Sequence, residues 1–134
     1  MIIDITPLEK SIARLEEGLT RYQQHVKDSQ LRDGLIQRFE FTYELAHKML
    51  KRYLRLTSAT PEQFDDMPFQ DLIRLGNAQK LLLDDWPAWR LYREIRSKTS
   101  HTYDEEVALE VVQYIPNFLK EACYLREQLK KHAG

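Results

Sequence analysis

The chain has few glycine and proline residues, which interrupt helices. It also has few of the features that mark secreted or membrane proteins. Its 134 residues include one cysteine, Cys123, which excludes an internal disulfide and a zinc site built from cysteines. No uncharged apolar stretch approaches the roughly 20 residues of a transmembrane helix. The first residues lack the basic segment and apolar run of a signal peptide. These absences favour a cytoplasmic protein with no membrane contact.

The chain also lacks an excess of charge and the common phosphate and metal motifs. Twenty basic residues balance twenty-one acidic ones, and the net charge is −1. Such a chain has no overall field that attracts polyanions, so any RNA binding must come from a local patch. There is no glycine-rich phosphate loop, no His-Glu-x-x-His motif and no serine nucleophile elbow. The sequence therefore predicts neither a cofactor nor a metal ion.

With only four glycines and five prolines, long segments keep a helical period and none alternates as a strand does. A first helix is predicted from Thr6, capped by its hydroxyl with Pro7 and Glu9 following. Its apolar residues recur at alternating steps of four and three: Leu8, Ile12, Leu15, Leu19, Tyr22 and Val26. This spacing is typical of helical bundles.

Further helices are predicted over residues 30–56, 68–79, from Asp84 or Asp85 to Arg96, and over 103–131. The last one contains Pro116, which removes a backbone hydrogen bond at a cost of about 3 kcal/mol, so we expect a kink near Val112. Residues 1–134 should form one domain. We expect an all-α protein, an antiparallel up-and-down four-helix bundle with an additional short helix.

Two sets of side chains on these helices can each be interpreted in two ways, as structural or as functional. A polar line runs along the second helix at steps of three and four: Asp33, Gln37, Glu40, Glu44 and His47. It is either a solvated face or a face turned toward a functional site or a partner. Trp86 and Trp89 could stack on bases, but aromatic residues at helical spacing usually pack inward, so we expect them in the core.

The most informative stretch is residues 96–105. Thr102 and Glu105 have the spacing of a capping box, which predicts that a new helix starts there. Arg96 would then end one helix, His101 would lie between helices and Tyr103 would occupy the first turn of the next. On one continuous helix Arg96 and His101 would point about 140° apart, so they can cooperate only if the helix breaks or a second copy contributes.

An arginine and a histidine suit metal-independent RNA cleavage. Histidine can take or give a proton near neutral pH, and a guanidinium can stabilise a phosphate whose charge grows. A purely structural alternative is that His101 orients the turn, Arg96 pairs with Asp104 or Glu105, and Tyr103 packs against Trp89. The carboxylates at positions 104–106 would also repel an anion approaching the helix N-terminus.

The spacing Arg, four residues, His, one residue, Tyr resembles the signature of HEPN domains, in particular the HepT-like branch, also called nucleotidyltransferase substrate-binding proteins. Residues 33–46 resemble the second-helix block of that family, and the resemblance covers almost the whole chain. It implies a HEPN-like four-helix bundle and a homodimer with the motif at a shared cleft. It also implies a ribonuclease with Arg96 and His101 as catalytic residues, supported by Ser97, Gln37, Glu40 and Glu44. Ser97 departs from the Asn, Asp or His often found after the arginine.

The resemblance further implies a toxin-antitoxin module in which a minimal nucleotidyltransferase adenylylates Tyr103 and silences the nuclease. An alternative role in this family is a non-catalytic subunit that binds the nucleotide or substrate of a two-component nucleotidyltransferase. A third reading is a dimeric helical scaffold. The nucleotidyltransferase chemistry itself must belong to another chain, because it needs a sheet with a metal-binding carboxylate pair that this sequence does not offer.

Overall fold

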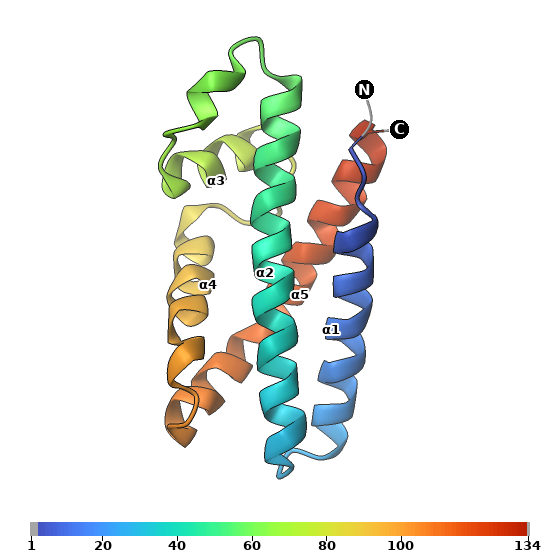
Figure 1. Ribbon diagram of the computed structural model, residues 1–134, viewed down its shortest axis with the longest axis vertical. Coiled ribbons are helices and arrows are strands. Elements are labelled where there is room, and N and C mark those ends of the chain that lie inside the picture. Colours follow the sequence, from blue (N-terminus) through green and yellow to red (C-terminus); the bar gives the residue numbers. More distant parts are fainter. Residues whose placement is uncertain (1–2, 134) are drawn as a thin grey trace.

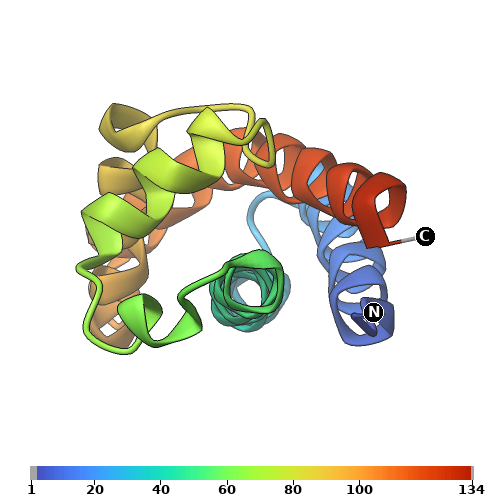
Figure 2. The same cartoon turned by 90° about the horizontal axis from the view of Figure 1, so that it is seen from above.

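The computed structural model describes residues 3–133, and within them it contains helices and no strand. Four long helices form the bundle: α1 (Thr6–Gln24), α2 (Ser29–Thr57), α4 (Trp86–Lys98) and α5 (Glu105–Ala133). The short helix α3 (Phe69–Ala78) and two 3₁₀ helices, η1 (Pro61–Phe64) and η2 (Thr99–His101), complete the fold. Figure 1 shows α2 between α1 and α4, and Figure 2 shows α5 behind it. The predicted all-α bundle with an additional short helix is confirmed.

Aspartate carboxylates accept free N–H groups at the starts of α1, α2, α4 and α5, in two cases where the sequence predicted a threonine. The Asp28 carboxylate accepts the backbone N–H groups of Gln30 and Leu31, and Asp85 caps α4 as one of two predicted candidates. The predicted cap at Thr6 is wrong, because Thr6 is already helical and donates its own N–H to the Asp4 carboxylate, 3.0 Å away. A charged oxygen accepts the free N–H groups of a helix start more strongly than a hydroxyl.

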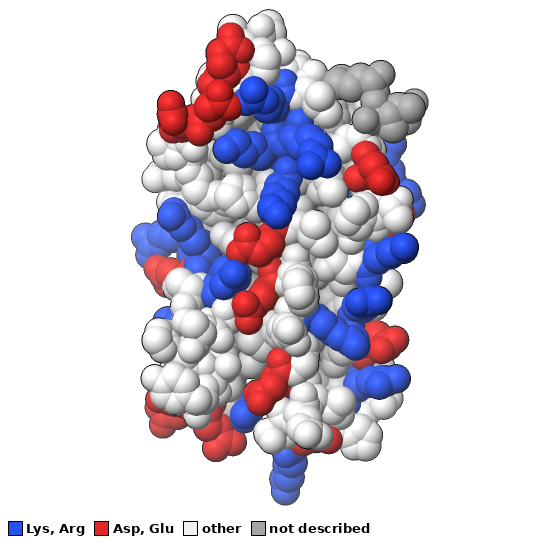
Figure 3. All heavy atoms as spheres, in the orientation of Figure 1, with Lys and Arg blue, Asp and Glu red and all other residues white. Residues whose placement is uncertain are grey.

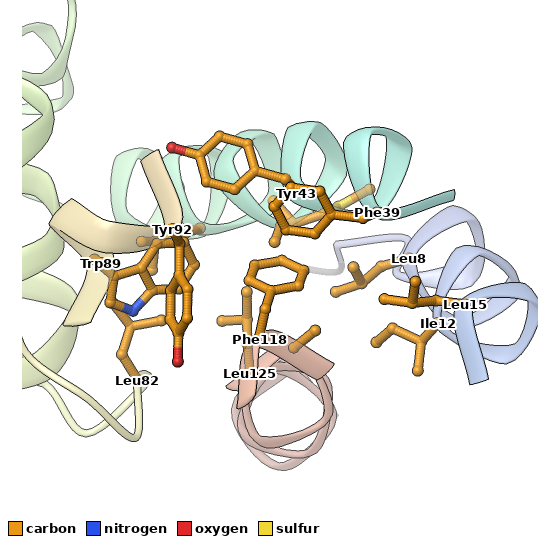
Figure 4. Packing of buried hydrophobic residues seen from close by; sticks show 14 of the residues in the cluster. Leu8, Ile12, Leu15, Phe39, Tyr43, Leu82, Trp89, Tyr92, Phe118 and Leu125 are labelled. Atoms are coloured by element: carbon orange, nitrogen blue, oxygen red, sulfur yellow. The ribbon is translucent and has the colours of Figure 1, made fainter. Parts of the chain in front are cut away.

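The core is built around an aromatic cluster from three helices. Phe39 and Tyr43 on α2, Trp89 and Tyr92 on α4 and Phe118 on α5 have ring centroids 5.1 to 6.2 Å apart (Figure 4). The buried Leu8, Ile12 and Leu15 of α1 close the other side, as Figure 4 also shows. Such contacts fix the position of α4 against α2, on which the site described below depends.

The two tryptophans lie as the core interpretation predicts, and the predicted seam of α1 needs one correction. Trp89 is fully buried, and the half-buried Trp86 packs against the core. Val26 is 59% exposed, because α1 ends at Gln24 and Val26 lies in the following loop. Helix α5 continues through Pro116, and Figure 2 shows that it follows a curved course around α2.

Among the residues that the structure describes, no helix combines the length and apolar content needed to cross a bilayer.

One buried carboxylate, which the sequence patterns did not single out, holds the start of α4 in place. Glu121 on α5 has no exposed surface and accepts three hydrogen bonds: from the backbone N–H groups of Leu83 and Asp84, at 2.8 and 2.9 Å, and from Trp89 Nε1 at 2.6 Å. Burial raises the pKa of the Glu121 carboxyl, an effect that the three hydrogen bonds only partly offset. Glu121 thereby ties the loop before α4 and the core tryptophan of α4 to α5.

We expect Glu121→Gln to lower the free energy of unfolding by about 1 to 3 kcal/mol, because the amide group leaves one buried N–H facing another donor. The native state binds the Glu121 proton more tightly than the unfolded state, so wild type should lose stability relative to the variant as the pH rises from 4.5 through the raised pKa. Urea unfolding at several pH values measures both effects. The exposed Glu127 is the control, and its Gln variant should change stability by less than about 0.5 kcal/mol.

Candidate functional site

The helix breaks between Arg96 and His101, as the spacing of residues 96–105 predicts. Helix α4 ends at Lys98, the 3₁₀ helix η2 covers Thr99–His101, and α5 starts at Glu105. The buried Thr99 stabilises the end of α4: its hydroxyl donates to the Arg96 carbonyl at 2.7 Å and accepts from Arg96 Nη1 at 3.1 Å. The backbone of Arg96 and its guanidinium are therefore both fixed at this break.

Arg96 is further held by the polar line of α2. Its Nε and Nη2 both lie 3.0 Å from Glu44 Oε1, and its Nη1 lies 3.7 Å from Glu40 Oε2. The planar guanidinium can contact two carboxylates at once, which fixes its orientation. The Arg96 side chain remains 31% exposed, so it is oriented without being sealed from solvent.

Arg96 lies between two open hollows of the surface. One, of about 250 Å³, is lined by Tyr43, Glu44, His47, Phe69, Arg93, Arg96 and Ser97. The other, of about 330 Å³, is lined by Gln37, Glu40, Phe41, Glu44 and Arg96. Four members of the polar line thus gather around Arg96, whereas Asp33 pairs with Arg32 at 3.3 Å.

The smaller hollow also contains Arg93 and Phe69, which the sequence reasoning did not assign to a site. Arg93 lies one helical turn before Arg96, and its guanidinium lies 5.3 Å from the centroid of the Phe69 ring. His47 packs edge-on against the same ring at 4.8 Å, and burial lowers the pKa of the His47 imidazole. The spacing of three residues between Arg93 and Arg96 could have revealed that both lie on one face of α4.

His101 and Tyr103 are both exposed beside this break. Their ring centroids lie 6.1 Å apart, and Tyr103 is 87% exposed. Tyr103 does not pack against Trp89, and it lies in the turn before α5 instead of in its first helical turn. Within the described residues, the hydrogen-bond partners of the Arg96 side chain are Glu44 and Thr99, and His101 is not among them.

The predicted capping box of Thr102 and Glu105 is wrong. Asp104 accepts the backbone N–H groups of Glu106 and Val107 at 2.9 and 3.4 Å, whereas the Thr102 hydroxyl donates back to Thr99. Glu105 instead forms an ion pair with Arg32 of α2 at 3.5 Å. A carboxylate thus already occupies the N-terminus of α5, which disfavours anion binding there.

Comparisons with known proteins identify the family of this chain. Residues 3–131 match the family model described as "nucleotidyltransferase substrate binding protein like". A probable ribonuclease HepT of Haemophilus influenzae (strain Rd) is 41% identical over 99 residues, which cover 73% of this chain and 66% of that relative, slightly less than two thirds of its length.

Two solved structures share the fold. One, from Haemophilus influenzae, reveals the fold of a substrate-binding domain of a nucleotidyltransferase: the TM-score is 0.88 at 33% identity, over 95% of this chain and 99% of that one. The other, from Thermus thermophilus, gives a TM-score of 0.71 at 31% identity, over 91% and 98% of the two chains. The family indicated by the spacing of Arg96, His101 and Tyr103 is thus confirmed, and the chain belongs to the nucleotidyltransferase substrate-binding protein family with its HepT-like relatives.

Proposed function

We propose that this protein is a HepT-like ribonuclease that cuts RNA without a metal ion and serves as the toxin of a two-protein module. The observation that carries the proposal is the break after α4: a guanidinium held by Glu40 and Glu44 lies just before it in the chain, and an exposed histidine and an exposed tyrosine follow. The relative described as a probable ribonuclease supports the same activity.

In this mechanism His101 takes the proton of a ribose 2′-OH, and the 2′ oxygen attacks the adjacent phosphorus. The new O2′–P bond forms as the P–O5′ bond breaks, and the leaving 5′ oxygen receives a proton from a general acid. Arg96 stabilises the negative charge that develops on the phosphate oxygens. The products are a 2′,3′-cyclic phosphate and a 5′-hydroxyl, and water supplies no atom.

A homodimer supplies the second acid-base group. One protomer offers His101 as the proton acceptor, and His101 of the partner subunit would donate to the leaving oxygen. The exposure of His101 leaves it accessible to such a shared cleft. Ser97, Gln37, Glu40 and Glu44 act as supporting residues that line the hollows beside Arg96. One domain over residues 1–134 and a cytoplasmic location are part of the same proposal.

Tyr103 is the proposed control point. Its 87% exposed phenol can enter the active site of a partner nucleotidyltransferase, the antitoxin of the module. Transfer of AMP from ATP forms a phosphodiester to the phenol oxygen and releases pyrophosphate. The attached phosphate would place negative charge beside His101, whose ring lies 6.1 Å from that of Tyr103, and would repel RNA.

A second candidate is a non-catalytic subunit that binds nucleotide together with a nucleotidyltransferase. The hollow of about 250 Å³ favours it, because Arg93 and Arg96 offer two cations beside the aromatic ring of Phe69. This candidate predicts nucleotide binding that depends on the partner and no RNA cleavage by the isolated protein.

The experiment that separates the candidates is incubation of the purified protein with transfer RNA in EDTA, beside His101→Ala. We expect wild type to cut and the variant to lose at least about 100-fold in rate, since it lacks its proton-transfer group. His25→Ala, at an exposed position after α1, is the matched control and should retain full activity. Equal cleavage by His101→Ala and wild type would contradict the catalytic assignment, and no cleavage by wild type would favour the binding subunit.

A further inference from the structure

Another hollow of the surface lies between α1 and α2 and shares Gln37 and Phe41 with one of the two beside Arg96. It has a volume of about 560 Å³, within the ~300–1,000 Å³ of ligand sites, and is lined by Pro7, Lys10, Ser11, Arg14, Gly34, Gln37, Arg38, Phe41 and Leu45. Three of these residues are cations, and none of the described residues that line it is acidic. We refer to it as the α1–α2 groove.

The groove combines positive charge with an exposed aromatic ring. Lys10 and Arg14 are exposed on α1, and Phe41 on α2 is 61% exposed. Arg38 is held in the wall by the Arg14 carbonyl at 2.7 Å and by Glu17 at 3.4 Å. Figure 3 shows several blue side chains along the α1 side of the face, with a few red ones among them, and further red side chains near its middle, over α2. A basic groove with an aromatic platform suits single-stranded nucleic acid.

The groove is continuous with the proposed catalytic site through Phe41. Phe41 and Gln37 line both the α1–α2 groove and the hollow that contains Arg96. A strand bound in the groove can therefore pass over Phe41 and reach Arg96. Glu40 and Glu44 lie on this route, but both face Arg96, which offsets part of their charge.

We propose that the α1–α2 groove holds the RNA strand next to the scissile phosphate, with one base stacked on Phe41 and phosphates at Lys10 and Arg14. The choice of RNA as ligand rests on the proposed ribonuclease function. A second copy of the chain fits this groove less well, because a two-fold axis through it would set the same three cations against one another.

The test measures binding of a fluorescein-labelled single-stranded RNA 20-mer by anisotropy, in the His101→Ala background so that no cleavage occurs. Phe41→Ala should weaken binding about tenfold to a hundredfold, the range of base–aromatic stacking. Lys10→Glu with Arg14→Glu should reduce the slope of log K against log salt by about 1.4, the value for two lost phosphate contacts on a single strand. The control, Lys120→Glu with Lys131→Glu on α5, changes net charge equally at positions outside the groove and should leave the slope unchanged.

A variant that fills the groove tests the same idea without removing charge. A Cβ at Gly34 meets no atom within 4 Å, and leucine favours a helix more than glycine, so Gly34→Leu should fold. It should weaken RNA binding at least about fivefold. Equal losses in the groove and control charge variants would overturn the proposal, as would unchanged binding by Phe41→Ala.

The oligomeric state of each variant, measured by sedimentation, shows whether a second copy of the chain occupies the groove instead of RNA. A dimer that Phe41→Ala converts to monomers would assign the groove to a second copy and overturn the proposal; unchanged assembly with weakened RNA binding supports it. These results also distinguish failure of the groove proposal from failure of the proposed ribonuclease function. If wild type binds RNA through the groove and cuts nothing, only the cleavage mechanism is wrong. If it cuts RNA and the groove variants bind normally, only the groove is wrong.

Discussion

Arg96→Lys should reduce RNA cleavage about 100- to 1,000-fold while the protein stays folded. The guanidinium contacts Glu44 through Nε and Nη2, and Glu40 and Thr99 through Nη1, so its planar shape fixes where it can meet a phosphate. A lysine ammonium keeps the charge but cannot make these contacts at once, and loss of one well-placed charge stabiliser costs this much in comparable sites. Single-turnover cleavage of a labelled RNA gives the rate, and thermal unfolding checks the fold.

The matched control for this change is Arg90→Lys. Arg90 is exposed on the same helix and pairs with Glu94 at 3.7 Å, outside the hollows around Arg96. We expect its cleavage rate to equal that of wild type. If Arg96→Lys cut RNA as fast as Arg90→Lys, Arg96 would serve only to join α4 to α2, and its role in transition-state stabilisation would be wrong.

Tyr103→Phe should keep full ribonuclease activity and escape silencing. The phenol is 87% exposed, so its hydroxyl contributes little to packing, and the substitution removes only the oxygen to which AMP would be attached. Incubation with the partner nucleotidyltransferase and ATP should add AMP to wild type and reduce its cleavage to background. The variant should gain no mass and remain active. Intact mass spectrometry and the RNA cleavage assay, run on the same samples, give both readouts.

Tyr114→Phe is the control for nonspecific modification, because Tyr114 is a half-buried residue of α5. It should gain AMP and lose activity as wild type does. An AMP increment on Tyr103→Phe, together with silencing, would move the modification to another side chain. Silencing without any mass change would show that the partner inhibits by binding alone.

The helices and the break at the site could be predicted from local patterns, because apolar periodicity and helix length depend on near neighbours. Arg96, His101 and Tyr103 thus lie around a helix break, as expected. The caps were predicted less well: Thr102 and Glu105 have the spacing of a capping box, but the carboxylate of Asp104 competes more strongly for the same N–H groups.

Contacts between distant segments could not be predicted. The polar line on α2 has the same spacing whether it faces water or Arg96, and only the packing of α4 against α2 decides that Glu40 and Glu44 meet the guanidinium. Glu121 gives no signal either, because its partners at residues 83 and 84 lie on a loop 38 and 37 residues away in sequence. The α1–α2 groove likewise exists only once Lys10 and Arg14 lie across from Phe41.

The central claim, that His101 and Arg96 direct a 2′ oxygen onto the neighbouring phosphorus, is tested most directly by the products of cleavage. The purified protein is incubated in EDTA with an RNA oligonucleotide and with the all-2′-deoxy oligonucleotide of the same sequence, and the ends are identified by mass spectrometry. We predict 2′,3′-cyclic phosphate and 5′-hydroxyl ends from the RNA, and no cleavage of the deoxy strand. Cleavage of the deoxy strand, 5′-phosphate ends, or no cleavage of RNA would contradict it.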